Sequence, residues 1–110
     1  MPKYGYVYIM ASSFKRLYIG FTTNLQERVW KHKNGFYPNS FTATYKIDRL
    51  VYFDRYPLIV RAIAREKELK GWLRKRKVAL IVANNPDWRD LSEGWGKPVE
   101  PFREPITPKK

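Results

Sequence analysis

The chain has 110 residues, enough for one domain with one hydrophobic core and too few for a catalytic domain plus a separate specificity domain. Lys and Arg total 22 against 10 Asp and Glu, so the formal net charge of +12 favours a polyanionic partner, either nucleic acid or an acidic membrane surface. An aromatic content of 16% favours nucleic acid, and the lack of cysteine excludes disulfides and thiolate metal sites. No signal-like segment or long apolar run is present, so we predict a soluble, cytoplasmic, nucleoid-associated protein with no membrane partner and no evident obligate protein partner.

Two alternating segments near the N-terminus predict a β-hairpin. Residues 4–10 and 16–21 alternate with period two, and residues 11–15 between them suit a hairpin loop. Counted outward from the middle of this loop, Tyr8 is expected directly opposite Tyr18, with both side chains on one face. The two phenols then form either an aromatic pair that stabilises the hairpin or part of a functional site.

The next segment predicts a short helix with two polar residues on its apolar stripe. A capping box that starts at Thr23 or Asn24 indicates a helix over residues 25–33. Arg28 and His32 lie on the stripe that should be apolar, four residues apart and therefore side by side. A histidine in such a place is usually a hydrogen-bonded packing residue, whereas the pair together also suits a binding site.

The second half of the chain predicts a third strand and a long helix. Residues 36–47 lack periodicity and are expected to form a loop, while residues 50–56 read as a strand. Pro57 suits the first position of the long helix. The apolar stripe of that helix is expected to continue to Leu73, with Glu66 in its middle.

The charges of this helix divide into an inward and an outward group. The inward carboxylate of Glu66 needs a cation, either an arginine such as Arg28 or a metal ion. Glu68 lies on the basic outer face and is expected to be exposed to solvent. The basic residues of segment 61–77 either follow a phosphate backbone or form a solvated face. Residues 77–86 are either a short helix or a strand.

Several motifs follow one another in an order that has a known counterpart. "YVY" ends at Tyr8, with Tyr6 in place of a glycine, and an intact "YIG" begins at Tyr18. "TTNLQERVWKH", "AIAREKELKGW" and "ANNPDW" follow. Over residues 5–88 this series resembles the GIY-YIG nuclease superfamily. The resemblance implies an α+β fold, with a three-stranded antiparallel β-sheet flanked by α-helices.

The Pro-rich composition beyond Trp95 predicts a tail, and the resemblance implies an activity and a set of site residues. Residues 1–94 would form the nuclease-like domain, and residues 95–110 a Pro-rich basic tail with little order. The implied activity is that of a metal-dependent DNA endonuclease that uses a single Mg²⁺ or Mn²⁺ ion. Its expected substrate is DNA, including branched DNA, and its expected pathway is DNA repair or recombination. The implied catalytic residues are Tyr8, Tyr18, Arg28, His32, Glu66 and Asn85. Glu66 would be the metal ligand, and Asn84 is the alternative to Asn85. The predicted DNA contacts are Lys15, Arg16, Lys31 and Arg65.

The resemblance gives each of these side chains an expected role in phosphodiester hydrolysis. Arg28 would bind the scissile phosphate, and Tyr8 would hold a phosphate oxygen or a water molecule. Tyr18 is the candidate general base if its surroundings favour the phenolate. The alternatives are proton transfer through His32, which could also donate to the phosphate, and a neutral Tyr18 that orients the water while the substrate phosphate takes the proton.

The remaining expectation concerns support for the site, and two readings compete with catalysis as a whole. Asn85 would orient Glu66 or the tyrosine. A basic nucleic-acid-binding module with the same fold explains the charge and the aromatic residues without turnover. A protein that binds an acidic partner explains the charge but not a carboxylate on an apolar stripe.

Overall fold

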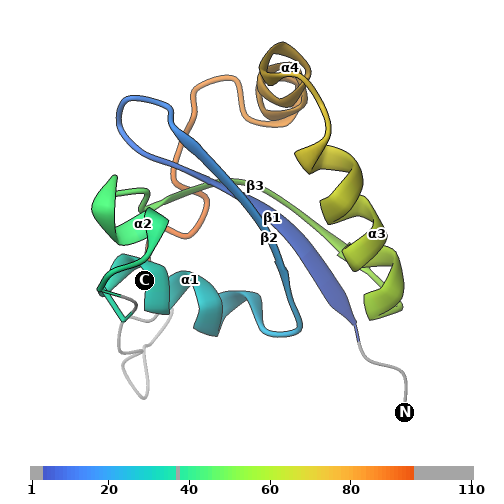
Figure 1. Cartoon of the computed structure of the whole chain (residues 1–110), viewed down its shortest axis with the longest axis horizontal. Helices are drawn as coiled ribbons and strands as arrows, with labels where there is room; N and C mark the ends of the chain where they lie inside the picture. Colours follow the sequence, from blue (N-terminus) through green and yellow to red (C-terminus); the bar gives the residue numbers. More distant parts are fainter. Residues whose placement is uncertain (1–3, 37, 96–110) are drawn as a thin grey trace, which may run out of the picture.

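The computed structural model describes residues 4–36 and 38–95 and contains the expected three-stranded antiparallel sheet. Strand β1 (Gly5–Ala11) lies between β2 (Leu17–Thr22) and β3 (Arg49–Tyr56), so both β2 and β3 are edge strands (Figure 1). The predicted α+β class is therefore confirmed. The expected tail begins at Trp95, and its residues 96–110 lie outside the described part of the chain.

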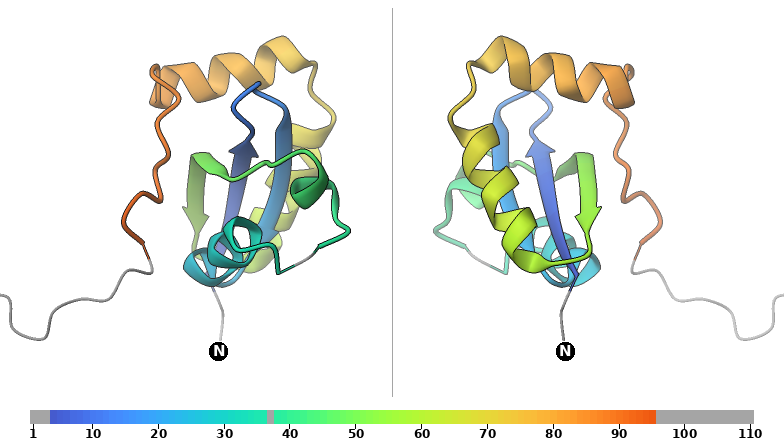
Figure 2. Two further views of the ribbon diagram at one scale, coloured as in Figure 1. Left: turned by 90° about the vertical axis from the view of Figure 1, so that its left-hand side faces the viewer. Right: turned by 90° about the vertical axis from the view of Figure 1, so that its right-hand side faces the viewer.

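In the described part of the chain, four helices surround this sheet. They are α1 (Leu25–Lys33), α2 (Phe41–Thr44), α3 (Ile59–Lys70) and α4 (Arg74–Asn84). Figure 2 shows α4 lying across the end of the sheet where the β1–β2 hairpin turns. No helix in the described ranges has the length and apolar character needed to cross a membrane.

The strand register differs from the expected one by two residues. Tyr8 pairs with Gly20, and Met10 pairs with Tyr18. The shift is an even number, so Tyr8 and Tyr18 still point to the same face, as expected, with ring centroids 6.2 Å apart. The expectation that they lie directly opposite each other was wrong, but the expected shared face was right.

The hairpin loop explains the shifted register. The backbone N–H of Ser12 donates to the carbonyl of Arg16 (3.0 Å), so the loop closes one residue later than expected. The hydroxyl of Ser12 accepts bonds from the backbone N–H groups of Phe14 (3.2 Å) and Arg16 (3.0 Å). Lys15 adopts a left-handed conformation with φ 64°. A side-chain hydroxyl thus fixes a turn that strand alternation alone does not specify.

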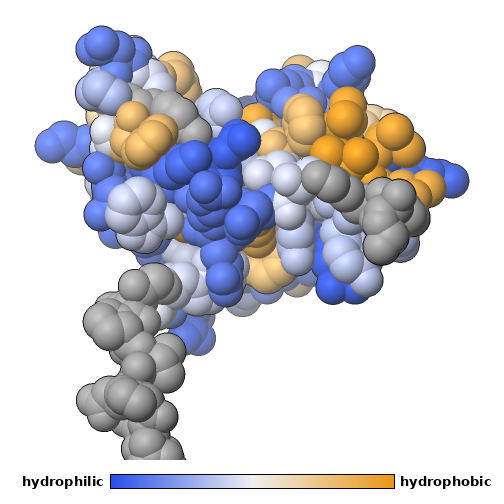
Figure 3. All heavy atoms as spheres, turned by 90° about the horizontal axis from the view of Figure 1, so that it is seen from below, coloured by the Kyte–Doolittle hydropathy of each residue, from blue (hydrophilic) through white to orange (hydrophobic). Residues whose placement is uncertain are grey.

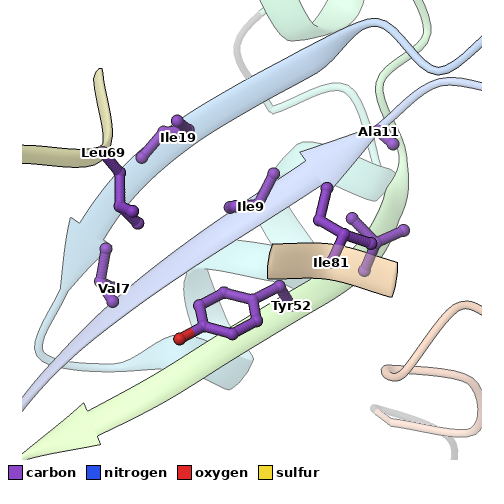
Figure 4. Packing of buried hydrophobic residues seen from close by; sticks show 8 residues of the cluster. Val7, Ile9, Ala11, Ile19, Tyr52, Leu69 and Ile81 are labelled. Carbon is purple, nitrogen blue, oxygen red and sulfur yellow. The ribbon is translucent and has the colours of Figure 1, made fainter. Parts of the chain in front are cut away.

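Each face of the sheet has its own core. One face packs an aliphatic cluster beneath α3 and α4, which Figure 4 shows from close by. That cluster consists of Val7, Ile9, Ala11, Ile19, Val51, Tyr52, Leu69 and Ile81. The other face packs against α1 and consists of Tyr8, Met10, Leu25, Val29, Ile47 and Leu50. Complete burial of one large apolar side chain contributes about 1.5–3 kcal/mol, so both clusters hold the helices to the sheet.

The close approach of α3 depends on a glycine in β1. A Cβ added to Gly5 would lie 2.8 Å from both the Cβ of Ala62 and the Cα of Ile59. Atoms that close would clash, so α3 could not keep its position against β1 with a larger residue at Gly5.

The helix boundaries confirm some expectations and correct others. Helix α1 has the expected bounds, and the side chain of Asn24, rather than Thr23, caps it by accepting from the backbone N–H of Glu27 (3.1 Å). Helix α3 begins two residues after Pro57, because the backbone of Leu58 is still extended. The ambiguous segment 77–86 is mostly helical and belongs to α4.

Two further expectations were wrong. Leu73 does not continue the apolar stripe, since α3 ends before Gly71 and the side chain of Leu73 is 69% exposed. The stretch expected to be a loop contains α2, which begins after Ser40, whose hydroxyl accepts from the backbone N–H of Ala43 (3.2 Å). A helix of four residues is too short to show periodicity.

Candidate active site

Tyr8 is the most deeply buried polar side chain of the candidate site. It lies beneath α1, and its Oη atom is 3.2 Å from Nε2 of His32. A Cβ added to Gly20 would lie 2.7 Å from this Oη, so the glycine of "YIG" makes room for the phenol. Burial and the neighbouring Tyr18 raise the pKa of Tyr8, and Arg28 opposes them only in part. Tyr8 is therefore a neutral hydrogen-bonding group at physiological pH.

His32 joins Tyr8 to a second hydroxyl. It lies in the last turn of α1, and its Nδ1 is 2.9 Å from Oγ1 of Thr42. Burial, together with the charge of Arg28, lowers the pKa of His32 to about 4. The imidazole is therefore neutral at pH 7, and one of its nitrogens donates while the other accepts.

Tyr18 and Arg28 form the part of the site that is accessible from the surface. Both are half-buried, and the ring of Tyr18 lies 5.3 Å from the ring of His32. An open hollow of about 320 Å³ lies beside them. It is lined by Tyr18, Arg28, His32, Ser40, Phe41 and Thr42. Four sequence-predicted residues, Tyr8, Tyr18, Arg28 and His32, are therefore brought together by two strands and one helix.

The sequence analysis missed the contribution of α2 to this hollow. Thr42 is buried, and its Oγ1 is 3.0 Å from the hydroxyl of Ser40, which lies at the rim. Ser40, Thr42, His32 and Tyr8 form a continuous chain of polar contacts. The capping preference of a serine before a short helix was the available signal, and the stretch was too short for periodicity to support it.

Glu66 lies on the other side of the sheet. Helix α3 covers the aliphatic face, and the Glu66 side chain is 8% exposed on it. Its carboxylate Oε2 lies 2.6 Å from Nζ of Lys70, one turn further along the same helix. The cation beside Glu66 is therefore Lys70, and the expected ion pair with Arg28 is not the one that forms. Glu68 is exposed and pairs with Arg65, as expected for the outer face.

The surroundings of Glu66 allow one kind of metal site. In the described ranges, no group of three or more His, Cys, Asp or Glu side chains is arranged to hold an ion. Mg²⁺ commonly takes one or two protein carboxylates and completes its shell with water and substrate oxygens. The donor chemistry of Glu66 fits such an ion, with Lys70 as the competing cation. Helix α3 packs against β2, the edge strand that also carries Tyr18.

Asn85 is a buried residue with backbone partners. Its Nδ2 donates to the carbonyls of Val51 (3.1 Å) and Arg89 (2.9 Å), and its Oδ1 accepts from the backbone N–H of Arg89 (3.0 Å). These bonds fasten the segment after α4 to β3. The neighbouring Asn84 is exposed and donates to the carbonyl of Leu80 in its own helix.

The four predicted DNA contacts occupy different parts of the surface. The ammonium of Lys15 lies 5.1 Å from the ring of Trp88, and the guanidinium of Arg16 lies 4.0 Å from the ring of Tyr45. Lys31, on α1, forms an ion pair with Glu27. Arg65 belongs to α3, on the opposite face of the sheet from the hollow.

Comparisons with known proteins place the chain in a family. Residues 4–79 match the model of the GIY-YIG catalytic domain, and the chain belongs to this family, whose fold is of the nuclease type. It is similar to two proteins named UPF0213. The one from Syntrophus aciditrophicus is 33% identical over 80 residues, covering 73% of this chain and 92% of that protein. The one from Haloquadratum walsbyi is 35% identical over 80 residues, covering 73% and 89%.

A solved structure supports the same assignment. The solution structure of a UPF0213 protein from Bacillus halodurans matches with a TM-score of 0.53 and 27% sequence identity. The match covers 82% of this chain and 95% of that one. The α+β architecture is thus shared across the described domain.

Proposed function

We propose that this protein is a metal-dependent DNA endonuclease that hydrolyses phosphodiester bonds in DNA repair or recombination. The observation that carries the proposal is the meeting of Tyr18, Arg28 and His32 around one open hollow, with Tyr8 buried behind them and in contact with His32. Membership of the GIY-YIG family and the formal charge of +12 support a DNA substrate.

Arg28 is the proposed phosphate-binding residue. Its guanidinium is a permanent cation, and two parallel N–H bonds to a phosphate would hold the scissile group in a fixed orientation. The same group would stabilise the negative charge that increases in the transition state. Tyr18 lines the same hollow and would orient the attacking water. The proton would pass to a Tyr18 phenolate or, with Tyr18 neutral, to the substrate phosphate.

His32 is proposed as a positioning residue for Tyr8. A histidine whose pKa is about 4 is a poor proton donor at neutral pH, so transfer of a proton from His32 is disfavoured. If the hydroxyl of Thr42 donates to Nδ1, the Nε2–H donates to Tyr8 and leaves the buried phenolic O–H to donate to the hydroxyl of Tyr18, which lines the hollow. The chain of polar contacts thus sets the direction of the Tyr8 hydrogen bond.

Glu66 is the proposed ligand of Mg²⁺ or Mn²⁺, completed by water and substrate oxygens. Such an ion would neutralise phosphate charge and stabilise the leaving oxygen. Binding must displace Lys70, whose side chain is 56% exposed, so that the metal ion replaces the ammonium as the cation beside the largely buried carboxylate. DNA that crosses the edge strand β2 would pass between the two helices that carry Arg28 and Glu66. Asn85 would support the site from a distance by holding the segment after α4.

The test is nicking of supercoiled plasmid with Mg²⁺ or Mn²⁺, with a chelator control. Arg28→Ala is expected to lower the cleavage rate about 10²-fold or more, because it removes a transition-state contact. Arg61→Ala, which removes the same charge from the exposed surface of α3, is expected to change the rate less than about twofold. Equal rates for the two variants would contradict the proposed role of Arg28.

A second candidate function is a basic DNA-binding module without turnover. The ion pair between Glu66 and Lys70 favours it, since it occupies the carboxylate without a metal. This module would bind DNA with strong salt dependence and leave the plasmid intact at every metal concentration.

A further inference from the structure

The tip of the β1–β2 hairpin presents an aromatic side chain to solvent. Phe14 is 93% exposed, the largest exposed fraction among the large hydrophobic side chains of the described chain. Its ring is not needed to close the turn, because the side chain of Ser12 and the backbone supply the turn's hydrogen bonds. A solvated turn would ordinarily carry small or polar residues at this position.

The loop that carries Phe14 is held from several directions. The guanidinium of Arg74 donates to the carbonyl of Lys15 (2.8 Å) and thereby ties the loop to the start of α4. The ammonium of Lys15 lies over the ring of Trp88, and the guanidinium of Arg16 lies over an aromatic ring next to α2. The backbone beneath Phe14 is therefore fixed before any partner binds, so little ordering entropy would be lost on contact.

The surface around the tip is rich in basic residues. Lys15 and Arg16 lie within the loop, and residues 74–77 at the start of α4 are all Lys or Arg. Residues 11–26 and 69–86 contain no Asp or Glu. Four cations in the first turn of α4 face the positive end of the helix dipole and do not stabilise that helix. Arg74 contacts the loop and the guanidinium of Arg76 lies 3.9 Å from the centre of the Trp72 ring, but the positive charge of the group is still available to an external polyanion.

We propose that Phe14 is a stacking wedge for an unpaired or unstacked base in branched or bulged DNA, with the surrounding basic residues on the phosphates. This inference rests on the proposed nuclease function, whose substrate structure it specifies. Apolar side chains that insert between bases act best where stacking is already broken, so the wedge favours distorted DNA over regular duplex.

The position of the wedge relative to the hollow predicts where the strand is cut. Phe14 lies in the turn and precedes Tyr18 by four residues, a span of at most roughly 13 Å even for a fully extended chain. One DNA strand has a phosphate about every 3.4 Å along the helix axis. The cut is therefore expected within about four nucleotides of the unpaired base.

DNA is favoured over an acidic membrane as the occupant. Arg16 directly precedes β2, and Tyr18 at the hollow is the second residue of β2, so a single DNA strand can contact the tip and the site together. The control surface lies at the other end of β1. There Tyr4 is 52% exposed, with the guanidinium of Arg55 4.0 Å from the centre of its ring.

The experiment measures binding by fluorescence anisotropy, with a chelator present, to a plain duplex and to the same duplex with a three-nucleotide bulge. Phe14→Ala is expected to weaken binding to the bulged duplex about tenfold, and binding to the plain duplex less than about twofold. Phe14→Trp is expected to retain bulge binding, because it preserves stacking. Tyr4→Ala, the matched aromatic control, is expected to leave both affinities unchanged. A bulge base replaced by 2-aminopurine should change its emission with wild-type protein and much less with Phe14→Ala.

The outcomes separate this inference from the proposed function. Equal effects of Phe14→Ala on both duplexes, or no effect on either, would overturn the wedge. The wedge would also be overturned if Phe14→Ala lost binding to vesicles of anionic phospholipid and kept its affinity for DNA. That result would assign the tip to a membrane surface. A protein that never cuts but shows the expected bulge preference would refute the nuclease proposal and retain the wedge.

Discussion

The two faces of the sheet use the same three strands for different purposes. The face beneath α3 and α4 buries aliphatic side chains, with Ile9 at 0% exposure in its centre. The face beneath α1 buries the polar groups of Tyr8 and His32, which are tolerated because they are hydrogen bonded. Figure 3, seen from below, adds a surface contrast: hydrophobic residues gather at the right of the view, while hydrophilic residues cover much of its left. Leu58 and Val60, at the start of α3, are among the exposed large hydrophobic residues. Packing therefore dominates one face and polar geometry the other.

This comparison predicts that the largest loss of stability comes from the aliphatic face. Ile9→Ala should lower the free energy of unfolding by about 2–5 kcal/mol, because it leaves a cavity in a fully buried cluster. Denaturant unfolding followed by circular dichroism measures the change. Under conditions in which the variant remains folded, it should keep its cleavage rate. A loss of cleavage without a loss of stability would contradict the division between the faces.

The polar face predicts an acid-sensitive stability. His32 has an ordinary pKa of 6.5 when unfolded and about 4 when folded. The unfolded chain therefore takes up a proton first as the pH falls, and stability should decrease between about pH 6.5 and pH 4, by on the order of 3 kcal/mol. Unfolding measured across this range should show a flatter profile for His32→Gln. Identical profiles for the two proteins would contradict the burial of a neutral imidazole.

The smallest expected effect concerns Thr42. Thr42→Val removes one hydrogen bond to His32 while keeping the shape of the side chain, so the cleavage rate should fall about fivefold, corresponding to roughly 1 kcal/mol. Thr42→Ser should restore most of the rate, since it returns the hydroxyl. If Val and Ser gave the same rate in a plasmid assay, Thr42 would serve packing and not the orientation of His32.

The sequence predicted the strands and α1 well because period-two alternation and a capping box are local signals. The strand register was not predicted correctly, because the turn is fixed by hydrogen bonds to the hydroxyl of Ser12. The alternation of the strands does not reveal these bonds. Helix α2 was too short for a periodic pattern, so Thr42 was missed with it. The ion-pair partner of Glu66 could have been predicted from the sequence, because Lys70 lies four residues later on the same helix face and this spacing favours an ion pair.

Of the candidate site residues, the members contributed by β1, β2 and α1 were the ones that came together. Tyr8, Tyr18, Arg28 and His32 belong to consecutive elements, so the hairpin and the helix that follows it bring them to one face. Glu66 lies on an element that covers the opposite face, a placement that depends on which side of the sheet the chain crosses after β3. Periodicity identifies an inward face but not which side of a sheet that face covers.

The most direct test of the central claim compares one tyrosine from each face. Tyr18 lines the hollow, and Tyr56 is a half-buried tyrosine that packs against the aliphatic cluster. The measurement is the single-turnover cleavage rate of a DNA substrate with Mg²⁺ for Tyr18→Phe and Tyr56→Phe. A loss of about 10²-fold for Tyr18→Phe, with less than a twofold change for Tyr56→Phe, is the predicted result. Equal rates for the two variants would show that the chemistry does not take place at this hollow.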